Sequence, residues 1–200
     1  MAQQRRPLPR RFFARDALVV ARELLGCELV LRRRGITCRG LIVETEAYCG
    51  VADRACHTFG GRRTPRTETM WGEPGHAYIY FTYGMHWCLN AVCAPAGDPQ
   101  AVLIRAVEPL EGVAAMQRRR GPNGRPEDLC RGPARLCAAF GLSGADDGRD
   151  LTQGALVIER RRSSPQGRVL TGPRIGVAYA GPDARKPWRF GIGAVHSRPF

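Results

Sequence analysis

The sequence predicts a single compact domain of the α/β class, of the α+β type, over residues 1–200. A chain of 200 residues can bury one sizeable hydrophobic core and is short for two. Short apolar runs of strand length alternate with turn residues along most of the chain, and few segments have helical periodicity. With 44% hydrophobic and 24% charged residues, we expect neither disorder nor a membrane span.

The first part of the chain predicts a basic arm, a helix and a hairpin. Residues 1–13 are rich in Arg and Pro and are expected to form a loose arm. Asp16 is a suitable N-cap for the next segment, and Gly26 is a suitable residue to follow its end, so a helix is expected between them. A strand over residues 28–31 and a second over residues 41–48 then form a β-hairpin.

The middle of the chain predicts a long loop and an aromatic hairpin. Residues 49–75 are polar and Gly-rich, and loops of this length are usually functional. Their Arg side chains suit contact with phosphates, but a merely solvated basic loop fits the sequence as well. Two strands follow, over residues 77–82 and 85–92. Alternation places Tyr78 and Tyr80 on one face of this hairpin, where they can form a stacking surface.

The remaining chain predicts two more helices and further sheet. Pro133 suits the first turn of a helix that ends before Gly141. The expected helices cover residues 110–119 and 132–140, and the expected strands cover residues 101–107, 155–159, 169–170 and 175–178.

Two acids in the strand over residues 41–48 are the first candidates for chemistry. Period-2 alternation places Glu44 and Glu46 on one face, beside apolar neighbours. Burial and a like-charged neighbour both disfavour ionised carboxylates, so such a pair suits acid–base work. An edge strand with two solvated glutamates is the alternative interpretation.

Two further side chains are unusual for their positions. Tyr83 lies at the predicted hairpin turn, where it is either a wedge for a stack of bases or an ordinary, partly buried tyrosine. Arg105 is the single charge in an apolar run, and a buried arginine needs an anionic partner.

The charge of the chain favours a polyanionic partner. The formal net charge is +13 and the isoelectric point is near 10.3, which indicates nucleic acid before a membrane surface. Lys186 is the single lysine among 31 basic residues. Arginine binds phosphate in a bidentate manner but is not an amine nucleophile, so Schiff-base chemistry would depend on Lys186 or the N-terminal amine.

The eight cysteines predict reduced thiols. A zinc site of Cys49, Cys56 and His57 has a spacing that fits no common zinc motif, so we expect no metal. No signal peptide is evident, and we expect a cytoplasmic, nucleoid-associated protein.

Several segments together resemble the alkyladenine DNA glycosylase family, also called the methylpurine or 3-methyladenine DNA glycosylase family. The resemblance spans nearly the whole chain, in order. It is carried by VETEAY at 43–48, His57 with the following Gly60-Gly61, TPR at 64–66, residues 80–90, RAVEPLEG at 105–112, residues 132–137 and RKPWRF at 185–190.

The resemblance implies a role for each matching residue. Glu46 corresponds to the general base that activates the hydrolytic water, and Arg105 to a residue at that water and the flipped nucleotide. The walls that stack on the flipped purine correspond to Tyr48, His57 and Tyr80. Asn90 corresponds to the residue that excludes guanine, and Tyr83 to the residue that intercalates into the duplex.

The resemblance also implies the fold and the reaction. We expect a curved, mostly antiparallel sheet with flanking helices and a protruding DNA-intercalating β-hairpin. The expected enzyme is a monomeric, monofunctional glycosylase without a cofactor. It would excise alkylated or deaminated purines of the 3-methyladenine, 7-methylguanine, hypoxanthine and etheno-adenine class from double-stranded DNA. The alternatives are a non-catalytic basic nucleic-acid-binding protein and a sugar O-glycosidase that uses Glu44 and Glu46, which the net charge disfavours.

Overall fold

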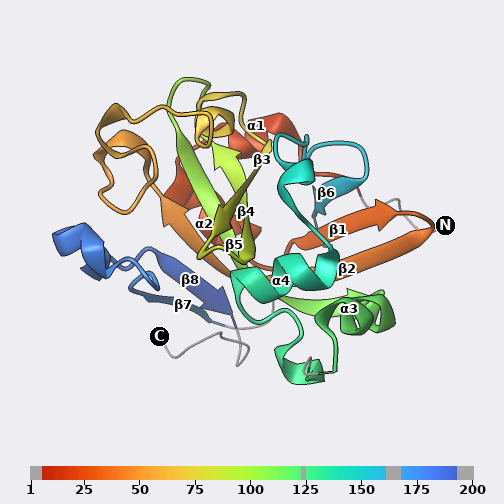
Figure 1. Cartoon of the computed structure of the whole chain (residues 1–200). Coiled ribbons are helices and arrows are strands. Elements are labelled where there is room, and N and C mark those ends of the chain that lie inside the picture. The colour runs from red at the N-terminus through yellow and green to blue at the C-terminus, as the bar shows by residue number, and fades with distance from the viewer. Residues whose placement is uncertain (1–5, 123–124, 161–167, 193–200) are drawn as a thin grey trace.

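One curved antiparallel sheet with short helices around it forms the protein, as the computed structural model shows for residues 6–122, 125–160 and 168–192 (Figure 1). The α+β class and the curved, mostly antiparallel sheet predicted from the sequence are confirmed. The described strands are β1 Glu28–Arg33, β2 Ile36–Tyr48, β3 Ala77–Thr82, β4 His86–Cys93, β5 Gln100–Glu111, β6 Leu156–Glu159, β7 Val169–Gly172 and β8 Arg189–Ile192.

The helices are short, and most of the described helical elements are single turns. The α-helices are α1 Arg10–Phe13, α2 Ala17–Leu24, α3 Val113–Arg120 and α4 Pro133–Phe140. The 3-10 helices are η1 Gly50–Ala52, η2 Phe59–Gly61, η3 Glu68–Trp71, η4 Pro126–Asp128, η5 Gly144–Asp146 and η6 Ala178–Arg185. The predicted loop over residues 49–75 therefore contains three single turns and no strand.

Strand β2 organises the sheet, because it pairs with three other strands. The order β3-β4-β5-β2-β1-β6 runs across the sheet, and β8 pairs with both β2 and β7. Partner β1 covers one edge of β2 up to Leu41, and β8 takes the same edge from Glu44 to Glu46. Register shifts around Glu44 mark a bulge against β5. Bulges bend a strand and redirect its side chains, and they are common beside functional sites.

The bends of the sheet depend on small side chains as well as on the bulge. A Cβ added to Gly40 of β2 would lie 2.6 Å from the Val107 Cγ2 atom of β5. The two strands can therefore approach this closely only because Gly40 has no side chain.

The helices begin and end where the sequence predicts for α2 and α4. The Asp16 carboxylate accepts a hydrogen bond from the Leu18 amide and caps α2. Helix α4 begins at Pro133 and is followed by Gly141, whose φ of 70° suits a C′ residue. The Thr45 hydroxyl donates to the Ala21 carbonyl at 2.8 Å and joins α2 to β2.

The predicted loose arm over residues 1–13 is wrong for its second half. Pro7 forms a β-bridge with Glu159, and the side chains of Leu8, Phe12 and Phe13 are buried in the core. Burying three large apolar side chains outweighs the entropy of ordering a short segment. Residues 1–5 of the arm lie outside the described part of the chain.

One predicted strand is absent, and the bounds of other elements differ from the prediction. The strand expected over residues 175–178 is wrong, because Gly176 has a φ of 78° and the chain bends there before η6. Helix α3 begins three residues later than expected, because β5 continues to Glu111 and Gly112 then turns the chain with a φ of 77°.

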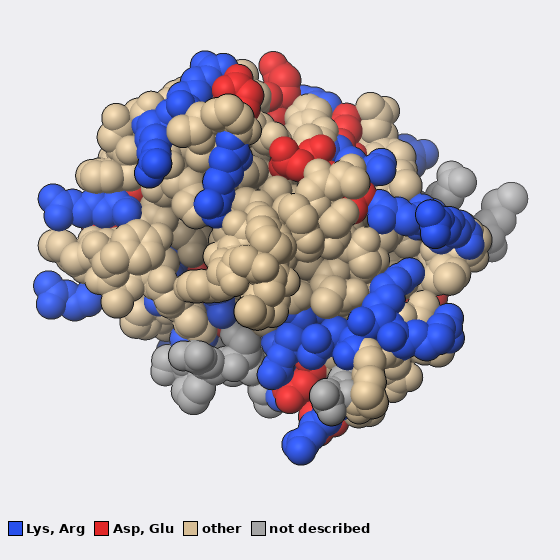
Figure 2. Space-filling model, viewed as in Figure 1, with Lys and Arg blue, Asp and Glu red and all other residues tan. Residues whose placement is uncertain are grey.

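Basic side chains outnumber acidic ones on the visible surface. In Figure 2, Lys and Arg side chains form several groups, many of them around the rim of the face, and Asp and Glu side chains are fewer. A dense basic group lies over the region of α3, whose last turn contains Arg118, Arg119 and Arg120. Among the described residues, every helix is too short or too polar to cross a membrane.

Candidate active site

An aromatic cavity of about 540 Å³ lies between the β3–β4–β5 part of the sheet, the loop over residues 49–75 and the segment over residues 175–179. Alternation along β3 points Tyr78 and Tyr80 into this cavity and Ile79 into the hydrophobic core, as the sequence predicts. The aromatic and imidazole rings that line it are those of Tyr48, His57, Tyr78, Tyr80, Tyr83 and Tyr179.

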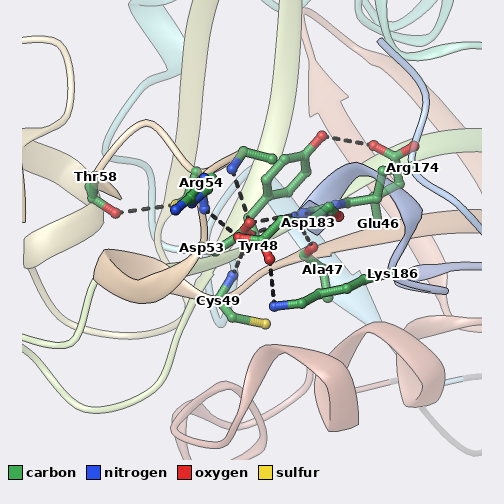
Figure 3. Close-up of polar contacts among 12 residues, drawn as sticks. Glu46, Ala47, Tyr48, Cys49, Asp53, Arg54, Thr58, Arg174, Asp183 and Lys186 are labelled. Carbon is green, nitrogen blue, oxygen red and sulfur yellow. Dashed lines mark hydrogen bonds and ion pairs between the residues drawn. The ribbon is translucent and has the colours of Figure 1, made fainter. Parts of the chain in front are cut away.

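The Glu46 carboxylate lies directly behind the cavity wall and is fully buried. Its Oε2 atom accepts a hydrogen bond from the Tyr48 hydroxyl at 2.8 Å (Figure 3). Its Oε1 atom accepts one from the Ile175 amide at 2.8 Å and lies 3.2 Å from Arg105 Nη1. All three partners line the cavity, although Glu46 itself does not. A carboxylate bonded in this way is held in one orientation at the edge of the cavity.

The second acid of the strand has a different set of partners. Glu44 Oε1 lies 3.0 Å from Arg189 Nη1 of β8 and 3.4 Å from Arg105 Nε. Arg105 thus contacts both Glu44 and Glu46, which confirms that the two acids share a face of β2 and that the buried arginine has anionic partners. Burial alone would lower the pKa of Arg105, but the charges of Glu46 and Glu44 raise it above the ordinary arginine value.

Hydrogen bonds and ring contacts fix one wall of the cavity. The His57 Nδ1 atom and the Tyr78 hydroxyl share a hydrogen bond of 2.8 Å. The rings of His57 and Tyr80 form a T-shaped contact with a centroid distance of 4.6 Å, and the ring centroid of Tyr78 lies 5.4 Å from that of Tyr80. Burial lowers the pKa of His57 to about 4, and Arg66 and Arg62 add to this shift. The imidazole is therefore neutral at pH 7.

Comparisons with known proteins agree with this geometry. The sequence model of the methylpurine-DNA glycosylase family matches residues 11–195. A protein of Burkholderia lata is 49% identical over 188 residues, which are 92% of this chain and 87% of that protein. A protein of Rhodopseudomonas palustris is 47% identical over 96% of this chain and 89% of its own length. One from Bacillus cereus is 44% identical over 91% of this chain and 93% of its own. Each of the three carries the provisional name of a 3-methyladenine DNA glycosylase.

The chain belongs to the methylpurine-DNA glycosylase family. It is thus a member of a family of DNA glycosylases, as the resemblance in the sequence implies. The family match covers both the aromatic hairpin and the segment that bonds Glu46.

Two more predicted residues of this glycosylase-family chain border the cavity. Asn90 is buried, and its Nδ2 atom donates to the Tyr78 carbonyl at 3.0 Å, which fixes its amide against the aromatic wall. Tyr83 lies at the tip of the β3–β4 hairpin with 81% of its surface exposed. Its φ of 52° is unusual for a residue with a side chain and belongs to a tight turn with Gly84.

Sequence reasoning missed a second group of residues at the site. The buried Arg174 and Asp53 are paired behind Tyr48, and Ile175 bonds Glu46. Tyr179 lies at the cavity rim with 71% of its surface exposed, and its hydroxyl donates to the Ala55 carbonyl at 3.2 Å. Gly176 is the residue in the sequence that could have indicated this group, because a glycine within an apolar run favours a turn over a regular strand.

The candidate metal ligands do not form a metal site. Within the described ranges, no three His, Cys, Asp or Glu side chains are grouped so as to hold a metal ion, and Cys49, Cys56 and His57 are no exception. The Cys56 Sγ atom instead lies 3.2 Å from the Thr58 hydroxyl. All eight cysteines are free thiols, and burial raises the pKa of Cys49 to about 12.

Proposed function

We propose that this protein is a monofunctional DNA glycosylase that excises alkylated or deaminated purines from duplex DNA. The single observation that carries the proposal is a carboxylate held by three groups that all line an aromatic cavity. The cavity supplies a place for a flipped base, and the carboxylate supplies a base for water. Enzymes that act on a base of duplex DNA extrude that base into a pocket of this kind.

Base flipping is the first step, because a base inside a duplex cannot reach a buried site. Extruding a nucleotide costs a few kcal/mol of unstacking, and a damaged base costs least. Tyr83 is exposed at the hairpin tip beside the cavity, where its ring can fill the gap that the nucleotide leaves.

Stacking then selects the base. Each base–aromatic stack contributes about 1–3 kcal/mol, and a positively charged N-alkylated purine gains more from electron-rich tyrosine rings. We assign this role to Tyr48, His57 and Tyr80, all of which line the cavity. Asn90 is fixed against the wall and would crowd the exocyclic amino group of guanine.

Hydrolysis follows at the Glu46 carboxylate. Its Oε2 atom accepts one hydrogen bond from the described residues, that of Tyr48, and an ionised carboxylate oxygen has room for a second donor. A water at that position would give a proton to Glu46 as its oxygen bonds to the anomeric carbon of the sugar, and the purine would leave with the electron pair of the broken N-glycosidic bond. The carboxylate would stabilise the oxocarbenium-like transition state. Arg105 stays cationic beside Glu46 and holds the carboxylate in one orientation.

The shortage of amines supports hydrolysis without strand cleavage. A lyase step needs an amine at the sugar, and Lys186 is the single lysine of the chain. Its Nζ atom lies 2.8 Å from the Asp183 carboxylate and 4.3 Å from the Trp188 ring centroid, outside the cavity lining. We therefore expect Lys186 to form no Schiff base with the sugar, and the proposed product is an intact strand with an abasic site.

The partner in this proposal is double-stranded DNA, bound by a monomer in the cytoplasm at the nucleoid. The formal net charge of +13 and the basic face in Figure 2 favour contact with phosphates.

The test is excision from duplexes that each contain one defined lesion, with wild type beside Glu46→Gln. We expect wild type to release free purine. Glu46→Gln should still bind the lesion duplex, but its single-turnover excision rate should be about 10²–10⁴-fold lower than that of wild type. If wild type releases no purine and Glu46→Gln binds the lesion duplex as tightly as wild type does, the result would instead favour a non-catalytic nucleic-acid-binding protein. Release of a sugar would favour an O-glycosidase, and borohydride trapping on DNA would contradict the monofunctional reaction.

A further inference from the structure

A fully buried ion pair lies on the protein side of the Tyr48 ring (Figure 3). Arg174 Nη1 donates to Asp53 Oδ2 at 2.5 Å, and Nη2 donates to Asp53 Oδ1 at 2.8 Å. The Arg174 guanidinium carbon lies over the Tyr48 ring, 4.8 Å from its centroid. Tyr48 lines the cavity and Arg174 does not, so the ring separates the guanidinium from the cavity.

The same pair is attached to the groups that hold the catalytic carboxylate. Arg174 Nη1 also donates to the Ala47 carbonyl at 3.0 Å, between Glu46 and Tyr48 in β2. The amide of the next residue, Ile175, donates to Glu46. A change in the position of Arg174 would therefore move both the floor of the cavity and a donor to Glu46.

Asp53 determines the net charge on the side of the Tyr48 ring that faces away from the cavity. Its carboxylate also accepts from the amides of Cys49 and Ala55, at 3.1 and 3.0 Å, so its position is fixed. Burial alone would lower the pKa of Arg174, but the hydrogen bonds and charge of Asp53 raise it above the ordinary value. Arg174 is therefore a cation, and its charge is cancelled by Asp53.

A neutral pair behind the ring has a consequence for the base in front of it. An isolated guanidinium would repel a cationic base across the ring, whereas a neutral base would be much less affected. We propose that Asp53 is a specificity-determining positioning residue: it neutralises Arg174 and so allows a positively charged purine to stack on the cavity side of Tyr48. This inference rests on the proposed function and names positively charged purines as the substrate class that the Asp53–Arg174 pair favours.

The test compares one cationic and one neutral lesion in the Asp53→Asn variant, which keeps the shape of the side chain and removes its charge. Duplexes with 7-methylguanine and with hypoxanthine are cleaved under single-turnover conditions by the same enzyme preparation. We expect the rate for 7-methylguanine to fall about tenfold more than the rate for hypoxanthine. Equal losses for both lesions would mean that Asp53 is only structural, and would overturn the inference. The ratio of two rates does not depend on the fraction of folded protein.

A double variant, Asp53→Asn with Arg174→Met, removes both charges. We expect both rates to be low but their ratio to return to within about twofold of wild type. A ratio that stays at the Asp53→Asn value would show that charge is not the cause and would also overturn the inference.

The wild-type reaction separates this inference from the proposed function. If wild type excises neither lesion, the proposed function fails whatever the variants do. If wild type excises only one, the dissociation constants of the two lesion duplexes replace the rates. Asp53→Asn must then weaken binding of the 7-methylguanine duplex about tenfold more than binding of the hypoxanthine duplex, or the inference is wrong.

Discussion

Strand β2 contributes to buried groups of charges at two places, and one of these groups adjoins the aromatic cavity. Near its start, Arg39 Nη1 lies 2.7 Å from both Glu28 and Glu159. Near its end, Glu44 and Glu46 share Arg105. We call the first group the distal cluster and the second the cavity cluster. Both consist of buried carboxylates paired with arginine, so ion pairing and burial alone do not distinguish a functional site from a structural one.

The surroundings of the two clusters make the difference. The distal cluster connects β1, β2 and β6, and its carboxylates are bonded by side chains of Arg32 and Arg39. In the cavity cluster, the Glu46 carboxylate is bonded by a tyrosine hydroxyl and a backbone amide at the edge of an aromatic cavity. A reactive carboxylate is thus distinguished from a structural one by whether its hydrogen-bond partners line a cavity. The following experiments test this distinction.

The largest expected effect separates the two acids within the cavity cluster. Glu46→Gln lowers the single-turnover excision rate about 10²–10⁴-fold, because the base for the water is lost. Glu44→Gln lowers it less than about tenfold, because Glu44 pairs with Arg105 and Arg189, whereas the attacking water is proposed to lie at Glu46. Rates normalised to folded protein, measured on one lesion duplex, check this order. Equal losses would mean that the two carboxylates act as a unit.

The next effect concerns stability in the distal cluster. Arg39→Met lowers the free energy of unfolding by about 3–5 kcal/mol, because the buried Glu28 and Glu159 lose the cation that they share, although Arg32 still pairs with Glu159. The excision rate of the folded protein stays at the wild-type value. Urea unfolding gives the first quantity, and a single-turnover assay at low temperature gives the second. A stable but inactive Arg39→Met protein would erase the distinction between the clusters.

The two regions respond to acid over different pH ranges. His57 beside the cavity has its pKa lowered to about 4 from an ordinary 6.5, so its contribution to stability is complete above pH 6.5 and is lost as the pH falls to 4. Burial would raise the pKa of Glu159, but Arg32 and Arg39 lower it below 4.5. Its contribution is complete above pH 4.5 and is lost only below that pH.

This difference predicts the effect of a His57→Asn variant. Between pH 7 and pH 4.5, wild type should lose up to about 3 kcal/mol more unfolding free energy than His57→Asn. Urea unfolding at several pH values measures this difference. The two proteins should lose stability in parallel below pH 4, because His57 is then protonated in the folded as well as in the unfolded state. Parallel curves over the whole range would mean that His57 is not a buried neutral group.

The smallest effect is expected at the edge of the distal cluster. Glu111 is 54% exposed and lies 3.4 Å from Arg39 Nε. Glu111→Gln should change the unfolding free energy by less than about 0.5 kcal/mol, because water screens an exposed ion pair. It serves as the matched control for Arg39→Met. A loss above 1 kcal/mol would mean that Arg39 needs all three of its carboxylates.

Local patterns in the sequence were sufficient for much of this site. Alternation along single strands placed Glu44 with Glu46 and Tyr78 with Tyr80, and the structure confirms both pairs of neighbours. Helix α4 was predicted within one residue of its bounds, because Pro133 and the following glycine mark its ends. These predictions succeeded because each depends on residues that are close in the chain.

Long-range pairs were the part that the sequence could not predict. Asp53 and Arg174 are 121 residues apart, and neither lies in a pattern that points to the other. Arg174 also precedes an apolar run that imitates a strand, so its segment was assigned to the sheet and not to the site. The prediction of a loose arm over residues 1–13 was wrong for a related reason. The composition of this segment resembles that of a disordered tail, whereas the burial of Leu8 and Phe13 depends on tertiary neighbours.

The left-handed backbone at Tyr83 bears on any attempt to engineer this protein. A residue with a side chain at a φ of 52° raises the energy of the folded state by about 1 kcal/mol, which glycine would not. Selection for heat resistance alone should therefore favour Tyr83→Gly and remove the ring that the proposed reaction needs. In a library screened for melting temperature alone, a stabilising substitution at Tyr83 would be selected although it removes the ring that the proposed reaction needs.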